Sequence, residues 1–151
     1  GVDQEGCLPK TAWPPTYTGF PARELRINVI NEQRGDAFAD TVSETAVCSY
    51  RGSGDKFYIS YKTDGSRVMI RVENGRASVK RTGEFGSDML YIPGEETEFS
   101  YRTPYGSIPM KVLTEFFEYD LSEDGGVIEL GYVLRAGGDE LNNRIKIKIE
   151  R

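Results

Sequence analysis

The stretch "VMIRVENGRASVKR", residues 68–81, has the pattern that decides the fold. Large apolar residues occupy every second position up to the dipeptide Asn74-Gly75, and a second alternating segment follows it. Asn-Gly between two such segments is the strongest short-range signal for a β-hairpin with a two-residue turn. In the register that this turn sets, the facing pairs are Glu73–Arg76, Val72–Ala77, Ile70–Val79 and Val68–Arg81. Arg81 therefore falls on the apolar face, while Glu73 and Arg76 meet outside as an exposed ion pair.

The same period of two recurs along most of the chain. Apolar residues alternate with polar ones in segments 25–29, 128–134 and 145–149, and turn signals rich in Gly, Asn and Asp separate the segments. No window of a dozen residues has a convincing helical stripe. We therefore expect an all-β fold of about 8–10 strands. An open sheet of that size would leave exposed edges, so the strands either stack as a sandwich or close, and we favour a closed antiparallel up-and-down β-barrel.

The beginning of the chain differs in kind from the rest. Four of the seven prolines lie in residues 1–23, together with Trp13, Tyr17 and Phe20. Proline at this density excludes a helix or a central strand. We expect residues 1–23 to form a proline- and aromatic-rich arm that covers an apolar seam or one mouth of the barrel, and residues 24–151 to form the single barrel domain.

Composition narrows the function classes. The chain has 151 residues, a formal charge of -5 and no histidine. Histidine-based nucleophile pairs, general bases and metal sites are thereby excluded, and the acidic balance argues against nucleic acid as a partner. Cys7 and Cys48 lack the spacing of a zinc or redox motif, and a buried thiol at Cys48 is favoured over a disulfide between them. We expect no catalytic residues, no metal and no cofactor.

The corner "TPYG", residues 103–106, joins two more alternating segments. Pro104 and Gly106 suit a tight turn, and the even-numbered loop places Phe99 and Tyr101 on the same face as Met110. Beyond it the apolar phase switches near Phe116, which predicts a β-bulge.

Six residues on predicted inner faces are the candidate ligand-binding set: Arg81, Tyr101, Phe99, Tyr132, Met110 and Tyr61. An inward guanidinium needs hydrogen-bond partners, so Arg81 either holds a carboxylate ligand or ties strand ends together, and the structural role is the commoner one. Glu44 is the nearest candidate for an inward carboxylate that could pair with it, although an exposed position fits its pattern equally well. The other five residues fit core packing, or as a set the wall of a small amphipathic site.

These strands also resemble a known family. The run "VKRTGEFGSDMLYIPGEETEFSYRTPYGSIPMKVLT", residues 79–114, with "GGVIELGYVL", residues 125–134, and "NNRIKIKIE", residues 142–150, is similar to the YwiB-like family of bacterial proteins of unknown function. The resemblance covers roughly residues 24 to 150. It implies a calycin-like, lipocalin-related β-barrel in the bacterial cytoplasm, with no established activity.

The preferred functional hypothesis is a barrel that binds a small amphipathic or apolar molecule, with Arg81 as its polar anchor. The alternative is a protein-interaction or scaffold module that docks through its outer face or through the arm, and a homodimer is compatible with either. An enzyme has the least support. No membrane span is predicted. The expected location is the cytoplasm, with a secreted form as the alternative because Gly1 indicates a trimmed N-terminus.

Overall fold

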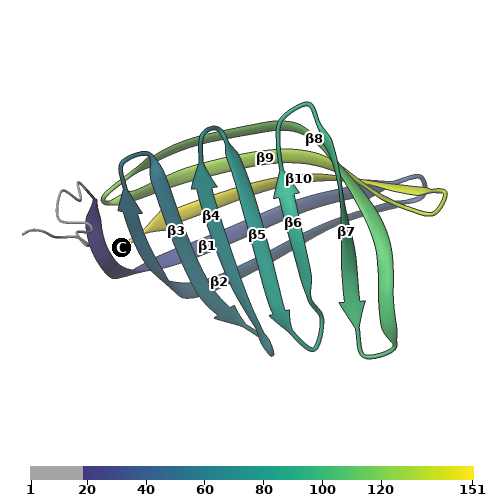
Figure 1. The fold of residues 1–151 in the computed structure, drawn as a ribbon, viewed down its shortest axis with the longest axis horizontal. Helices are drawn as coiled ribbons and strands as arrows, with labels where there is room; N and C mark the ends of the chain where they lie inside the picture. Colours follow the sequence, from purple (N-terminus) through teal and green to yellow (C-terminus); the bar gives the residue numbers. More distant parts are fainter. Residues whose placement is uncertain (1–18) are drawn as a thin grey trace, which may run out of the picture.

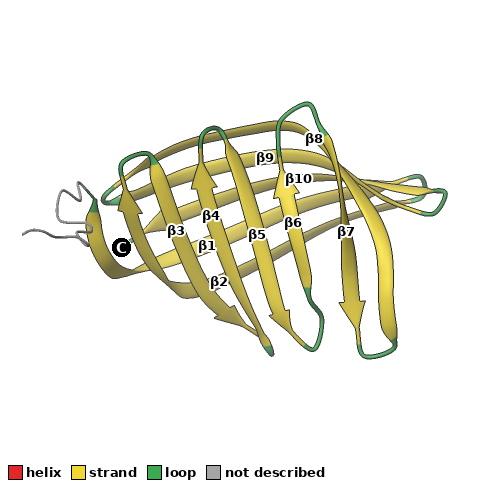
Figure 2. Cartoon of the chain, viewed as in Figure 1, coloured by secondary structure: helices red, strands yellow, loops and turns green. Residues whose placement is uncertain are grey.

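The structure is a computed structural model that describes residues 19–151, and these residues form a β-barrel without helices (Figures 1 and 2). The strands are β1 (Phe20–Gly35), β2 (Phe38–Ser53), β3 (Lys56–Thr63), β4 (Ser66–Glu73), β5 (Arg76–Gly83), β6 (Ser87–Tyr91), β7 (Glu96–Thr103), β8 (Gly106–Ser122), β9 (Gly125–Ala136) and β10 (Asp139–Glu150). The all-β prediction is confirmed.

All strand pairs are antiparallel, in the order β6-β5-β4-β3-β2-β1-β10-β9-β8-β7. Each strand therefore lies beside its neighbours in sequence, and the pairing of β1 with β10 joins the two ends of the chain. The barrel is nearly closed where β6 and β7, the two ends of this order, stand next to each other (Figure 1). In this β6–β7 seam the backbones pair at Gly86 and Arg102, with N–H···O distances of 3.0 and 2.8 Å.

The hairpin that decides the fold has the predicted register. Asn74 and Gly75 both have positive φ angles, 53° and 73°, as a two-residue turn of this type requires. Val68 faces Arg81 across the hairpin, and on its other side Arg81 faces Ser87 of β6.

The predicted ion pair between Glu73 and Arg76 on the outer face of this hairpin is wrong. Glu73 pairs with Arg71 at 2.6 Å and with Lys56 at 3.8 Å, and not with Arg76. Phe57 and Val72 are partners in the β3–β4 ladder, so Lys56 of β3 faces Glu73 of β4. The β4–β5 hairpin alone does not reveal this neighbour.

The predicted bulge in β8 is confirmed. The register with β9 shifts between Thr114 and Phe116, so Glu115 is the extra residue. After the shift Phe117 points into the core. Gly131 lies opposite Phe116, and a Cβ at that position would overlap the Phe116 ring, which explains the need for glycine there.

Aromatic rings fill one end of the barrel, which we call the filled end. It lies near the β8–β9 turn, at the left of Figure 1. Tyr50 is fully buried and its hydroxyl donates to the carbonyl of Ser122 at 2.6 Å. Ring pairs continue outward from Tyr50 to Phe20 (centroids 5.3 Å apart) and to Phe57 (6.3 Å). These rings close the barrel at that end.

The strand β1 begins at Phe20, four residues before the predicted domain boundary at Glu24. Pro21 is accommodated because the pairing of β1 with β2 is irregular between Phe20 and Arg23, where no regular ladder bond is required. Phe20 packs against Tyr50 at the filled end. Trp13, Tyr17 and Cys7 lie outside the described residues. Cys48 is buried with a free thiol.

Candidate functional site

The other half of the barrel contains a cavity of about 620 Å³. It lies between the walls formed by β1–β4 and β7–β10, with β5 and β6 completing its lining. Most of its surface is apolar and comes from Val29, Val68, Ile70, Val79, Met89, Phe99, Met110, Leu130, Leu134, Ile145 and Ile147. The buried residues of the filled end, such as Tyr50, Phe57 and Phe117, take no part in the lining.

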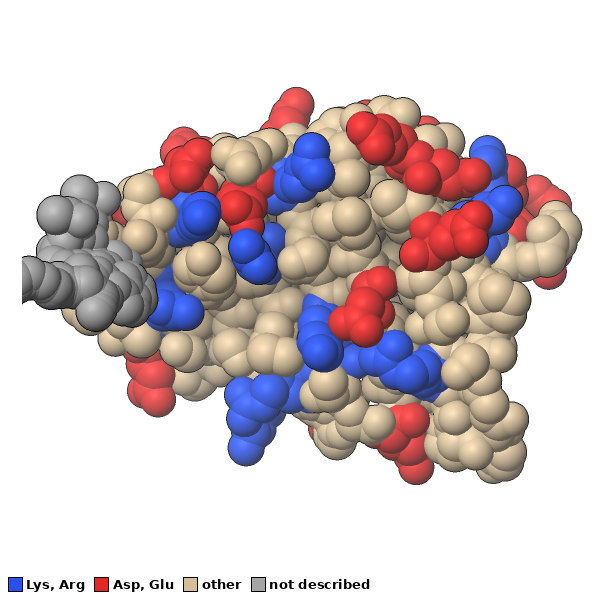
Figure 3. All heavy atoms as spheres, in the orientation of Figure 1, with Lys and Arg blue, Asp and Glu red and all other residues tan. Residues whose placement is uncertain are grey.

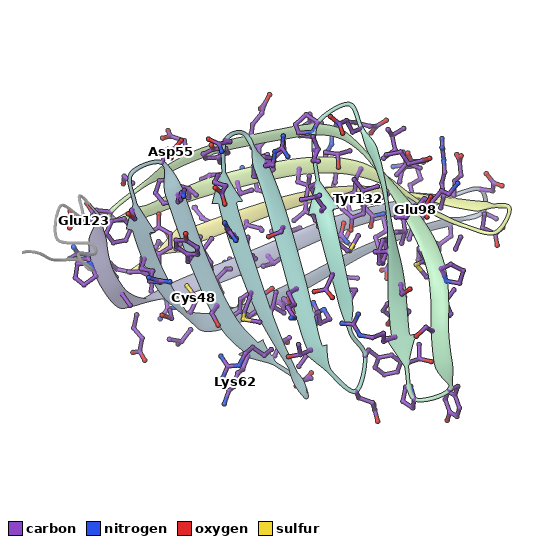
Figure 4. All side chains as sticks on the ribbon, in the orientation of Figure 1. Cys48, Asp55, Lys62, Glu98, Glu123 and Tyr132 are labelled. Carbon is purple, nitrogen blue, oxygen red and sulfur yellow. The ribbon has the colours of Figure 1, made fainter. Side chains whose placement is uncertain are left out.

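All six predicted site residues line this one cavity. Tyr61 comes from β3, Arg81 from β5, Phe99 and Tyr101 from β7, Met110 from β8 and Tyr132 from β9. Tyr132 is labelled on its strand in Figure 4. Alternation brings them together because every inward position of a small closed barrel faces the same interior.

Arg81 is the cationic residue among those that line the cavity, and it is half-buried. Within residues 19–151 its guanidinium has no hydrogen-bond or ion-pair partner, and it is not among the buried unpartnered groups, so solvent reaches it. The positive charge of Arg81 lowers the pKa of three tyrosine hydroxyls of the wall, those of Tyr61, Tyr91 and Tyr132. The arginine thus lies among hydroxyl groups at an otherwise apolar surface.

The three tyrosines nevertheless stay protonated. Burial raises the pKa of Tyr61, and the Glu44 carboxylate raises it further. Burial is also the main cause of the raised pKa of Tyr91, which lies against Tyr132 with ring centroids 5.0 Å apart, and of the raised pKa of Tyr132. Each hydroxyl therefore remains a neutral donor at physiological pH.

Glu44 does point inward, but it does not pair with Arg81. One carboxylate oxygen accepts a hydrogen bond from the Tyr61 hydroxyl at 2.9 Å, and the other accepts one from Thr63 at 3.1 Å. Glu44 lines the same cavity as Arg81, yet no atoms of the two groups come within ion-pair distance among the described residues. The two charges are separate features of the wall.

The cavity meets solvent beyond the ends of several strands. Val42, Asp64 and Phe85 all line it and are exposed. Phe85 stacks with Tyr101 at a centroid distance of 6.1 Å. These residues form the mouth of the cavity, opposite the filled end.

Sequence reasoning missed part of the wall. Tyr91 and Ser87 were not among the candidates because β6 follows an irregular segment, "GEFG" at 83–86, which hides its phase. A polar group was also missed, in which Asn143 accepts hydrogen bonds from Asn31 at 3.2 Å and Gln33 at 3.1 Å. The break in apolar alternation at these asparagines and the glutamine was the signal that could have revealed it.

The described part of the chain has neither a metal-binding cluster nor a membrane-spanning helix. No group of three or more Asp, Glu or Cys side chains in residues 19–151 is placed to hold a metal ion. In the same residues, no helix has the length and apolarity needed to span a membrane.

Comparison with known proteins identifies the family. Residues 27–149 match the family described as "Domain of unknown function (DUF1934)". The chain belongs to the DUF1934 family. The matched residues include every residue that lines the cavity.

A curated relative of this DUF1934 chain is the "Uncharacterized beta-barrel protein YwiB" of Bacillus subtilis (strain 168), which is 24% identical over 90 residues. The match covers 57% of this chain and 63% of the relative. The crystal structure of YwiB protein from Bacillus subtilis has the same fold, with a TM-score of 0.74, 21% sequence identity, and coverage of 84% of this chain and 92% of that one. The YwiB-like resemblance is therefore confirmed, whereas the calycin-like classification stays a prediction.

Proposed function

We propose that the protein binds a small, partly apolar molecule inside the barrel, with Arg81 as the polar anchor. The observation that carries the proposal is the 620 Å³ cavity, which lies within the range typical of small-molecule sites. Such sites combine a mostly apolar wall with a few polar groups that orient the ligand, and the wall around Arg81 has this composition. In this proposal the barrel holds the molecule without transforming it.

The alternative of a docking surface has less support. Four exposed apolar residues lie on the β1–β2 hairpin, but Ile30 and Val47 are on its outer face, whereas Phe38 and Val42 follow the inward phase. Residues on opposite faces cannot form one continuous patch. A ligand in the interior is therefore the better-supported function.

Titration with the neutral fluorophore Nile red tests the proposal. Ile145→Trp places an indole in the cavity, since Ile145 lines it, whereas Lys146→Trp places the same indole on the outside of the same strand. We expect the wild type and Lys146→Trp to bind the dye equally, and Ile145→Trp to bind it at least about tenfold more weakly, as lost contacts in a filled pocket would cause. Circular dichroism is the check that both variants fold.

Two results would contradict the proposal. If the wild type does not enhance Nile red fluorescence, the cavity takes no apolar molecule. If all three proteins bind the dye equally, the dye lies on the outer surface.

A further inference from the structure

We propose that the ligand of this cavity carries a single acidic group, a carboxylate on an apolar body, which Arg81 binds through its guanidinium. This inference deepens the proposed function and rests on it. It assigns the chemical class of the ligand from the cationic residue of the wall and the apolar side chains around it.

Arg81 is the charged residue of the cavity wall that has no hydrogen-bond acceptor from the protein within residues 19–151. Since none of its N–H groups is among the buried unpartnered polar atoms of these residues, they face the solvent-accessible interior of the cavity. A carboxylate fits the guanidinium fork with two parallel charge-assisted hydrogen bonds, which are stronger than the hydrogen bonds that water offers. The ligand is the group that can supply that carboxylate.

The acidic residues of the wall do not make a matching demand for a cation. Both oxygens of Glu44 already accept hydrogen bonds, from Tyr61 at 2.9 Å and Thr63 at 3.1 Å. Asp64 lies in the exposed turn between β3 and β4, where water solvates its charge. The negative charges are therefore compensated or solvated, whereas the positive charge lines the cavity without a protein partner among the described residues.

The surroundings of Arg81 add neutral donors. The hydroxyls of Tyr91 and Tyr132 lie close enough for Arg81 to lower their pKa, and burial keeps them protonated, whereas the Tyr61 hydroxyl already donates to Glu44. The Tyr91 hydroxyl donates to the sulfur of Met89 at 3.2 Å, a weak acceptor that a carboxylate oxygen would outcompete. Arg81 and these hydroxyls together form a donor-rich group.

The rest of the wall fits an apolar body. Val79 shares β5 with Arg81, and Met89 flanks it on β6. From there the lining continues through Leu130 and Leu134 of β9 to Ile145 of β10, all apolar. A molecule anchored at Arg81 would therefore extend across apolar side chains.

The experiment compares three ligands of equal chain length as competitors of bound Nile red: decanoate, 1-decanol and decyltrimethylammonium. We expect wild-type protein to bind decanoate at least about tenfold more tightly than decanol, the size of a charge-assisted hydrogen bond, and the ammonium compound most weakly. In Arg81→Met the preference for decanoate over decanol should disappear. Arg67→Met, which removes an exposed arginine from the neighbouring strand β4, is the matched control and should keep it.

The outcomes separate this inference from the proposed function. Equal affinity for decanoate and decanol, or a preference for the ammonium compound, overturns the acidic ligand and leaves binding in the cavity intact. Failure of Nile red to bind overturns the proposed function itself. If Arg81→Met does not fold, the ranking of the three ligands by the wild type still decides the question.

Discussion

Tyr61 is the residue of the cavity wall whose hydroxyl is influenced by both Glu44 and Arg81. Its hydroxyl donates to Glu44 at 2.9 Å, and its pKa responds to Arg81 as well as to Glu44. Burial is the largest cause of its raised pKa. The neutral hydroxyl is thus part of the native structure, and its ionisation opposes folding.

This gives a prediction about alkaline pH. Because the pKa of Tyr61 is higher in the folded than in the unfolded protein, its contribution to stability is complete below the unfolded value of about 10 and is lost as pH rises above it. In Tyr61→Phe the free energy of unfolding should fall less steeply above pH ~10, by up to about 1.4 kcal/mol per pH unit. Urea unfolding between pH 8 and 11 measures this slope.

Tyr105→Phe is the control for that measurement, since Tyr105 is 98% exposed. It should leave the slope of the wild type unchanged. A Tyr61→Phe slope equal to that of the wild type would show that Tyr61 ionises in the folded protein as readily as in the unfolded chain.

For single residues, the sequence predicts whether a side chain faces inward where a clear turn fixes the strand register. Arg81 was placed on the inner face because Asn74-Gly75 fixes its partner as Val68. The hydrogen bonds of Glu44 could not be predicted, because they depend on Tyr61 and Thr63 of the adjacent strand β3 and on the curvature that brings them together. Contacts between side chains of different hairpins depend on how the whole barrel closes, which one hairpin does not specify.

Among the elements, the β6–β7 seam is the irregular part of the wall. Beyond the Gly86–Arg102 pair no backbone ladder joins the two strands within residues 19–151. The Thr97 hydroxyl instead donates to the carbonyl of Leu90 at 2.8 Å, and Arg102 pairs with Asp88 at 3.4 Å. Side chains therefore hold the seam together where backbone pairs would be expected.

Amide hydrogen exchange should be fast along the β6–β7 seam. Antiparallel pairing alternates, so the N–H groups of Asp88, Leu90, Glu98 and Ser100 point toward the seam and lack backbone acceptors. We expect these amides to exchange much faster than those of β4 and β9, which have a partner strand on each side. Residue-resolved exchange by NMR measures the difference, and equal protection of Asp88 and β4 would mean that the seam is fully paired.

The turn that fixes the β4–β5 hairpin supports a second prediction at this scale. Gly75 has φ +73°, and no atom lies within 4 Å of the place that a Cβ would occupy, so Gly75→Ala tests conformation without a steric clash. It should cost about 1–2 kcal/mol of unfolding free energy, the penalty of a left-handed residue with a Cβ. Gly138 lies in an open turn without positive φ, so Gly138→Ala should be neutral or slightly stabilising, and equal effects of the two changes would contradict this account.

Element boundaries were predictable where alternation meets a sharp turn. The phase switch at Phe116 revealed the bulge, and the TPYG corner gave the register of Phe99 with Met110. The start of β1 at Phe20 was not predicted, because Pro21 argues against a regular strand and the structure accommodates it in an irregular pairing. The glycine and proline signals predict regular hairpins better than the irregular joins between them.

As a whole, the molecule divides into a filled end and a hollow end. Aromatic rings around Tyr50 close the filled end, whereas the half around Arg81 retains the cavity. On the outside, acidic and basic side chains are interspersed on the face seen in Figure 3. The sequence predicted the barrel, and it could not predict the cavity, because its volume depends on barrel width and on how far side chains from opposite walls reach.

A crystal structure of the protein grown with decanoate tests the central claim most directly, namely that the hollow end is a binding site. We predict density for one extended molecule inside the cavity, with its carboxylate within hydrogen-bond distance of the Arg81 guanidinium and its chain along Leu134 and Ile145. A cavity filled by rearranged side chains, or decanoate found only on the outer surface, would contradict the claim.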